Sequence, residues 1–267
     1  MSEQHTSLQD AGHAADHNYD VGSPHLTHAH LRGMLIDTIR AVVAARQNAG
    51  ETVRVLEVGA GHGAFTDHVL ALGAHVTVTE MSRASADILA RRYEHNPAAE
   101  VIFDETGSLD GLAGRTFDVV LSVAVLHHIP DYLAAIEGWL RLLAPGGSFL
   151  TFQDPLYYPR RTRASMALGR GSYYVWRVLH GDLLEGAKSF ARRKRGAYDE
   201  ENVRDMVEYH VLRDGVDEQA VADLLRRHFG SVEIISYFST PSPALQRLGE
   251  RFDLPSDFGI RAEGYRG

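Results

Sequence analysis

Apolar positions along the chain follow two alternating patterns. Short continuous apolar runs predict strands buried on both faces of a parallel sheet, and apolar residues spaced three and four apart predict helices between them. The strands are expected at 53–58, 75–79, 101–103, 117–125, 148–152, 232–237 and 258–262, and the helices at 25–47, 66–72, 83–93, 131–143 and 217–229. This alternation predicts an α/β fold in which a doubly wound (Rossmann-like), seven-stranded, mostly parallel sheet carries helices on both faces.

The alternation breaks after the fifth strand, where about 60 residues of aromatic and basic sequence intervene. In doubly wound sheets ligands bind at the carboxyl ends of the strands, which is the edge where this segment leaves. We therefore expect a helical cap over a substrate at 154–216, inserted between strands 5 and 6. A flexible N-terminal arm is expected at 1–24, and the main domain at 25–153 and 217–267.

Composition narrows the class of protein. The 267 residues are 44% hydrophobic and include no cysteine, which excludes disulfides, thiol catalysis and cysteine-ligated metal sites. No apolar run approaches the roughly 20 residues that cross a bilayer, and the polar N-terminus is unlike a secretory signal. These features predict a cytoplasmic protein with no membrane partner.

Charge is distributed unevenly. The net charge is −8, yet residues 160–195 carry ten basic residues against two acidic ones. Such a segment can attract an anionic substrate or a nucleic acid. The alternative is a solvated helical surface that the acidic remainder of the chain balances.

The sequence VRVLEVGAGHG, at 53–63, joins a predicted strand to a predicted helix through glycines 59, 61 and 63. A strand that ends in closely spaced glycines lets a ligand approach the backbone, since no Cβ stands in the way. Glu80 ends the next strand, about where such folds place the carboxylate that holds ribose hydroxyls. The pattern predicts a nucleoside-cofactor site.

Four motifs in this order resemble the class I S-adenosylmethionine-dependent methyltransferases of the small-molecule, secondary-metabolite type. They are LEVGAGHG, the acidic strand end at Glu80, FDVVLSVAVLHHIPD and LLAPGG. The dinucleotide fingerprint of dehydrogenases has a different glycine spacing. The resemblance implies S-adenosyl-L-methionine as cofactor, S-adenosyl-L-homocysteine as product, and a final strand that runs antiparallel.

The resemblance also implies which residues bind the cofactor. Glu57, Gly59, Gly61 and Gly63 match the motif that holds its methionine part, and Glu80 matches the residue that grips the ribose hydroxyls. Met81 matches the apolar residue on the adenine, and Asp104 and Glu105 compete for the adenine amine. The backbone of Ser122 and Val123 matches positions along the cofactor.

Catalytic candidates follow the fourth strand. An imidazole can take a proton from a hydroxyl near neutral pH, and the resemblance places a histidine of the LHH motif against the acceptor. We expect His128 to be the base and His127 to support it; the alternative is that both shape the turn before a helix that Asp131 caps. The candidate substrate residues are Tyr19, Asp154, Tyr157, Tyr158 and Trp176, and Gln153 is a secondary candidate with Asp154 for orienting the substrate.

Three functions remain open. The favoured one is methyl transfer to a small molecule, anionic or aromatic, at oxygen in preference to nitrogen or carbon. The alternatives are nucleic-acid methylation through the basic cap, against which the SVAVLHH sequence argues, and a cofactor-dependent reaction such as cyclisation. No metal site is expected, since His25, His28 and His30 are best explained as incidental solvated histidines; a homodimer is left open.

Overall fold

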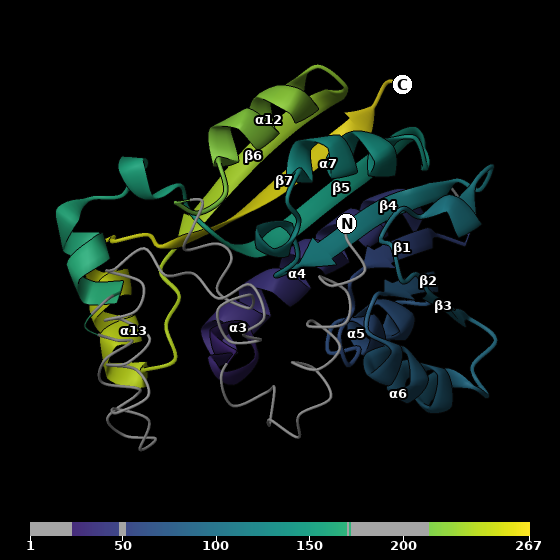
Figure 1. The fold of residues 1–267 in the computed structure, drawn as a ribbon, viewed down its shortest axis with the longest axis horizontal. Coiled ribbons are helices and arrows are strands. Elements are labelled where there is room, and N and C mark those ends of the chain that lie inside the picture. The colour runs from purple at the N-terminus through teal and green to yellow at the C-terminus, as the bar shows by residue number, and fades with distance from the viewer. Residues whose placement is uncertain (1–22, 48–51, 170, 172–213) are drawn as a thin grey trace.

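Seven strands form one sheet in the order β3-β2-β1-β4-β5-β7-β6 (Figure 1). The computed structural model describes residues 23–47, 52–169, 171 and 214–267. The strands are β1 (Arg54–Val58), β2 (His75–Glu80), β3 (Ala99–Phe103), β4 (Phe117–Val123), β5 (Leu143–Pro155), β6 (Phe229–Tyr237) and β7 (Asp257–Tyr265). β1 to β5 pair in parallel, while β7 runs antiparallel to both β5 and β6. The predicted doubly wound sheet is confirmed.

Helices cover both faces of this sheet. They are α3 (Pro24–Thr27), α4 (Ala29–Gln47), α5 (Thr66–Ala71), α6 (Arg83–Tyr93), α7 (Tyr132–Leu140), α12 (Glu218–Arg226) and α13 (Pro243–Arg251), with short 3-10 helices at Asp110–Leu112, Leu126–His128 and Tyr158–Arg160. In Figure 1, α7 and α12 lie on one side of the sheet and α4, α5 and α6 on the other. Each side has its own apolar core.

The central strand β4 shows why the apolar runs in the sequence are continuous. Val120 packs into the core beneath α7 and α12, while its neighbours Val119 and Leu121 pack into the core beneath α4 and α5. Successive side chains of a strand point to opposite faces, and both faces of this sheet are covered, so apolar residues follow one another without alternation from Val119 to Leu121.

Two helical regions differ from the sequence prediction. The single helix expected at 25–47 is divided, because His28 adopts an extended conformation (ψ 112°) between α3 and α4. The helix α13 was not predicted. Its N-terminus carries Pro243 in the first turn, which favours a helix start, and Gln246 and Gly249 are its buried residues.

The two ends of the segment expected to form the cap lie together. Leu156 and Val216 form a parallel bridge, and the backbone N–H of Tyr158 donates to the carbonyl of Asp214 at 2.6 Å. Residue 170 and residues 172–213 lie outside the described part of the chain, so the helical cap stays a prediction. Within the described ranges, no helix is long and apolar enough to span a bilayer.

Candidate functional site

The loop after β1 wraps closely around its neighbours. Gly59 and Gly63 have φ angles of 67° and 81°, in the left-handed region that favours glycine. A Cβ on Gly63 would lie 2.7 Å from the hydroxyl of Tyr93, and one on Gly59 would lie 2.9 Å from Cγ2 of Val125. These contacts require glycine at both positions, and they hold the loop beside the residues that follow β4.

Glu57 is a buried carboxyl group directly before this loop. Its side chain is only 3% exposed and accepts a hydrogen bond from Oγ1 of Thr66, in the first turn of α5, at 2.6 Å. Burial raises the pKa of Glu57 to about 7, and the Thr66 hydrogen bond opposes that rise. Glu57 therefore joins the end of β1 to α5 on the far side of the glycines.

Glu80, at the end of β2, holds the glycine loop through its side chain. Its Oε2 accepts from the backbone N–H of Gly61 at 2.8 Å, and its Oε1 accepts from those of Met81 and Ser82, both at 2.9 Å. A carboxylate has about four acceptor positions, so one remains for a ligand while all three bonds persist. The sequence placed Glu80 at this strand end but did not indicate its bond to the loop.

The third carboxylate lies at the end of β3. Asp104 accepts from the backbone N–H of Leu109 at 2.9 Å and from the hydroxyl of Thr106 at 3.1 Å, whereas Glu105 is exposed. Met81 lies against the same turn, with its sulfur 3.0 Å from where a Cβ on Gly107 would stand. Of the two acidic residues, Asp104 is the one fixed within the loop.

The end of β4 has an unusual backbone and an unpaired buried hydroxyl. Ser122 is fully buried, and its Oγ has no hydrogen-bond partner. Val123 ends the strand, and the next residue, Ala124, has a φ of 59°. A buried hydroxyl without a partner is uncommon in folded proteins and commonly marks a functional position.

His127 is held by a buried carboxylate from the neighbouring strand. Oδ1 of Asp154 lies 2.9 Å from Nδ1 of His127 and accepts the backbone N–H of the same residue at 3.1 Å. The other oxygen, Oδ2, accepts from the hydroxyl of Thr151 at 3.0 Å, and Asp154 is fully buried. The ring of His128 lies against that of His127, with centroids 4.0 Å apart. Asp131 caps α7 as expected, accepting the N–H of Ala134 at 3.0 Å.

The remaining candidates fall into two groups. Tyr19 and Trp176 lie outside the described residues. Tyr157 and Tyr158 lie where the chain leaves β5, and Arg160 and Arg161 lie over their rings at 4.7 and 5.5 Å. Arg160 also bonds to Glu218 at 2.7 Å, which fixes the start of this segment to α12.

The expectation of solvated histidines at the N-terminus is wrong for His25. This side chain is 6% exposed, stacks on Phe65 with centroids 6.0 Å apart, and its Nδ1 has no partner. Burial lowers its pKa to about 4. His28 contacts the backbone carbonyl of Thr240 at 2.6 Å. Within the described ranges, no group of three metal-binding side chains was found.

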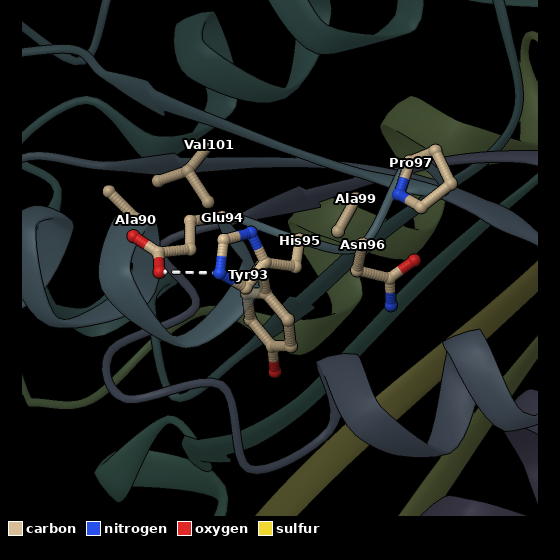
Figure 2. Close-up of a pocket in the computed structure, with 8 residues that line it drawn as sticks. All are labelled: Ala90, Tyr93, Glu94, His95, Asn96, Pro97, Ala99 and Val101. Carbon is tan, nitrogen blue, oxygen red and sulfur yellow. Dashed lines mark ion pairs between the residues drawn. The ribbon is translucent and has the colours of Figure 1, made fainter.

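Two hollows of similar volume among the described residues, about 450 and 430 Å³, lie away from this site. The first lies between the end of α6 and β3 (Figure 2). Its lining includes Glu94 and His95, which form an ion pair at 2.9 Å on the surface. The candidate residues instead gather where the parallel strands end, which is where ligands bind in such sheets.

Known proteins share this arrangement. A family model described as a methyltransferase domain matches residues 56–149, which include the glycine loop, Glu80 and the two histidines. The ubiquinone biosynthesis O-methyltransferase of Xanthomonas campestris pv. campestris is 30% identical over 178 residues, which cover 65% of this chain and 70% of that protein. The chain belongs to the class I S-adenosylmethionine-dependent methyltransferases.

Solved methyltransferases share the fold of this methyltransferase. The N-methyltransferase NodS from Bradyrhizobium japonicum, solved with S-adenosyl-L-homocysteine, matches 98% of this chain and 99% of its own, with 16% identity and a TM-score of 0.56. The CurJ carbon methyltransferase matches 90% of this chain, with 16% identity and a TM-score of 0.55. The match spans 56% of the CurJ chain, a little more than half its length.

The residues of this methyltransferase fit its family's cofactor. The φ angles of Gly59, Gly61 and Gly63 are 67°, 57° and 81°, so the loop turns tightly at the carboxyl end of β1, the edge of the sheet where ligands bind. Carboxylates end three successive strands, at Glu57, Glu80 and Asp104. Such acceptors suit the amino group, the ribose diol and the adenine amine of S-adenosylmethionine.

Proposed function

We propose that this methyltransferase transfers a methyl group to a hydroxyl of a small-molecule acceptor. When bound, S-adenosylmethionine supplies a methyl group already activated on a sulfonium, so the protein mainly has to align the acceptor and manage its proton. The pairing of His127 with Asp154 carries the proposal, because a hydroxyl must lose its proton as it is methylated and an imidazole fixed by a carboxylate can take that proton, whereas a neutral amine attacks through its lone pair. The curated O-methyltransferase relative supports the same atom.

His127 is the base in this proposal, and His128 packs against it. The sequence favoured the reverse order. A carboxylate at Nδ1 fixes the tautomer and orientation of an imidazole and stabilises the cation that forms when Nε2 takes a proton. Asp154 supplies that carboxylate to His127, and Thr151 holds Asp154 in turn. We therefore assign Asp154 to orienting His127 and not to contacting the acceptor.

The cofactor residues follow from the strand ends. The backbone of the glycine loop and Glu57 hold the methionine part, and Glu80 binds the ribose hydroxyls. Asp104 binds the adenine amine and Met81 packs on the ring beside it. Ser122 and Val123 lie along the cofactor, where the unpaired Oγ of Ser122 provides a polar contact.

The test is transfer of label from methyl-labelled cofactor. Purified protein is incubated with the labelled cofactor and an extract of host metabolites, and separately with host RNA and DNA. Label in an extractable small molecule supports the proposal, and methyl ether formation in that product establishes oxygen as the acceptor. Label in nucleic acid, or consumption of cofactor without transfer of its methyl group, contradicts it.

A further inference from the structure

Gln153 occupies a strained and buried position at the carboxyl end of β5. Its φ is 63°, in the left-handed region that residues other than glycine rarely adopt, and only 8% of the residue is exposed. It directly precedes Asp154, the residue that holds His127. Backbone strain of this kind is unfavourable and clusters at active sites and ligand-binding positions.

The side chain of Gln153 is fixed at one end only. Its Nε2 donates to Oγ of Ser239 at 2.6 Å and to Oδ1 of Asp257 at 3.4 Å, while its backbone N–H donates to the hydroxyl of Tyr237 at 2.7 Å. Its Oε1 is buried and has no partner. An unpaired buried acceptor destabilises the folded state, because the oxygen has lost its hydrogen bonds to water and gained none from the protein.

A second buried glutamine shows the usual alternative. Oε1 of Gln246 accepts the backbone N–H of Thr240 at 2.9 Å, and its Nε2 donates to the carbonyl of Phe238 at 2.6 Å. Both ends of Gln246 are therefore occupied by the protein. The two side chains have the same chemistry, and only Gln153 presents an oxygen that nothing in the protein uses.

The groups around Gln153 favour a neutral hydrogen-bond donor. Asp257 lies beside it, and burial raises the pKa of this carboxyl to about 7, against the opposing effects of the Ser256 hydrogen bond and the charge of Arg161. An amide oxygen accepts a hydrogen bond from a neutral hydroxyl without adding a charge to these surroundings. β5, β6 and β7 bring Gln153, Tyr237 and Asp257 together at the edge where β5 ends.

We propose that Oε1 of Gln153 accepts a hydrogen bond from a hydroxyl of the methyl acceptor, and that Gln153 is a specificity-determining residue. The inference rests on the proposed function. A site built to bond a hydroxyl discriminates strongly against analogues that lack it, because the buried acceptor is then left unpaired. The acceptor class is accordingly a hydroxylated molecule, and its methyl ether is bound more weakly.

The test follows the side-chain amide of Gln153 by nuclear magnetic resonance. Nitrogen-15-labelled protein is loaded with S-adenosyl-L-homocysteine and titrated with phenol and, separately, with anisole, which has the same ring and no hydroxyl donor. The Gln153 amide pair is identified as the pair that Gln153→Met removes. We expect phenol to shift this pair and anisole not to, while the pair from Gln246 stays in place with both.

Affinity provides the second readout. Gln153→Met is expected to weaken phenol binding about tenfold, which equals about 1.4 kcal/mol. Gln153→Gly, which accepts a positive φ without strain, provides a variant that keeps the backbone geometry. Gln47→Met, at the far end of α4, is the control and should leave phenol affinity unchanged.

The outcomes separate this inference from the proposed function. Absence of a Gln153 shift with phenol, or equal shifts with phenol and anisole, overturns the role of Gln153. Binding of S-adenosyl-L-homocysteine is measured in the same samples, and methyl transfer is measured in the labelled-extract assay. If phenol shifts the Gln153 amide but S-adenosyl-L-homocysteine does not bind, or no methyl group is transferred, the proposed function is contradicted. The hydroxyl-binding role of Gln153 is then still supported.

Discussion

His127 and Asp154 are joined by two contacts from one carboxylate oxygen, to the ring Nδ1 at 2.9 Å and to the backbone N–H at 3.1 Å. The pair couples the turn after β4 to the end of β5, and the fully buried Asp154 cannot reorient freely. A base needs a fixed orientation as well as a suitable pKa. This relationship supports His127, and not its neighbour, as the proposed base.

Replacing the base should slow methyl transfer without preventing cofactor binding. We expect His127→Ala to lower kcat for a hydroxyl acceptor by about 10²- to 10⁴-fold, the usual contribution of general base catalysis. His128→Ala should have a smaller effect, and His95→Ala, on the exposed ion pair of Figure 2, should have none. A larger loss in His128→Ala than in His127→Ala would restore the order that the sequence favoured.

The positioning role of Asp154 should appear in the pH profile. Asp154→Asn keeps the size of the side chain but removes the charge that stabilises a protonated His127. We expect kcat to fall and its acidic limb to move to lower pH, because the imidazole pKa falls without the carboxylate. The measurement is the pH dependence of kcat in wild type and in Asp154→Asn, with cofactor affinity as the control. If the acidic limb of the profile does not move, Asp154 has a structural role only.

Glu80 should contribute to cofactor affinity through its charge. Glu80→Gln removes the negative charge and replaces one carboxylate oxygen with an NH₂ group. The variant therefore loses the acceptor for Met81 and Ser82 or the acceptor for Gly61. Charged hydrogen bonds contribute about 1.5–3 kcal/mol, so we expect the Kd for S-adenosyl-L-homocysteine to rise at least about tenfold by calorimetry. The matched control is Glu105→Gln, on an exposed side chain that should not matter.

The buried carboxyl of Glu57 should make the cofactor-free protein less stable as pH rises. Its folded pKa of about 7 exceeds its ordinary value of 4.5, so the folded state binds more protons between these values. The free energy of unfolding then falls as pH rises from about 4.5 to 7 and is level above that range. Glu57→Gln removes this slope, since its amide oxygen still accepts from Thr66.

Above pH 7 this variant should therefore be more stable than wild type by about 1–3 kcal/mol. Urea unfolding at several pH values, compared between wild type and Glu57→Gln, isolates Glu57 from Asp257, which contributes a slope of the same sign. Parallel stability curves for the two proteins would show that Glu57 titrates as it does in the unfolded chain.

The glycine loop should not accept a side chain at Gly63. Gly63→Ala places a Cβ 2.7 Å from the Tyr93 hydroxyl on a backbone with φ of 81°. We expect unfolding free energy to fall by about 1–3 kcal/mol, from strain and contact together. Gly111→Ala, where a Cβ meets nothing within 4 Å and φ is not positive, should change stability little in the same thermal or urea measurement.

The sequence by itself determined the fold class and the positions of Gly59, Gly63 and Glu80, because continuous apolar strands, helical periodicity and glycine turns are properties of neighbouring residues. The antiparallel direction of the last strand came from the resemblance to the family and not from these local rules. The break at His28 was not visible in that way, since His28 contacts the distant Thr240 carbonyl. The helix α13 was missed although Pro243 stands in its first turn.

Only the tertiary structure decided which histidine is held and which oxygen is left unpaired. Asp154 and His127 are 27 residues apart, and Gln153 and Ser239 are 86 apart, on strands and loops that the sheet brings together. The spacing of apolar residues indicates which face of a helix or strand is buried, but it does not indicate which atoms form a hydrogen bond. The bond to His127 and the unpaired Gln153 oxygen arise from that long-range packing, which no local pattern encodes.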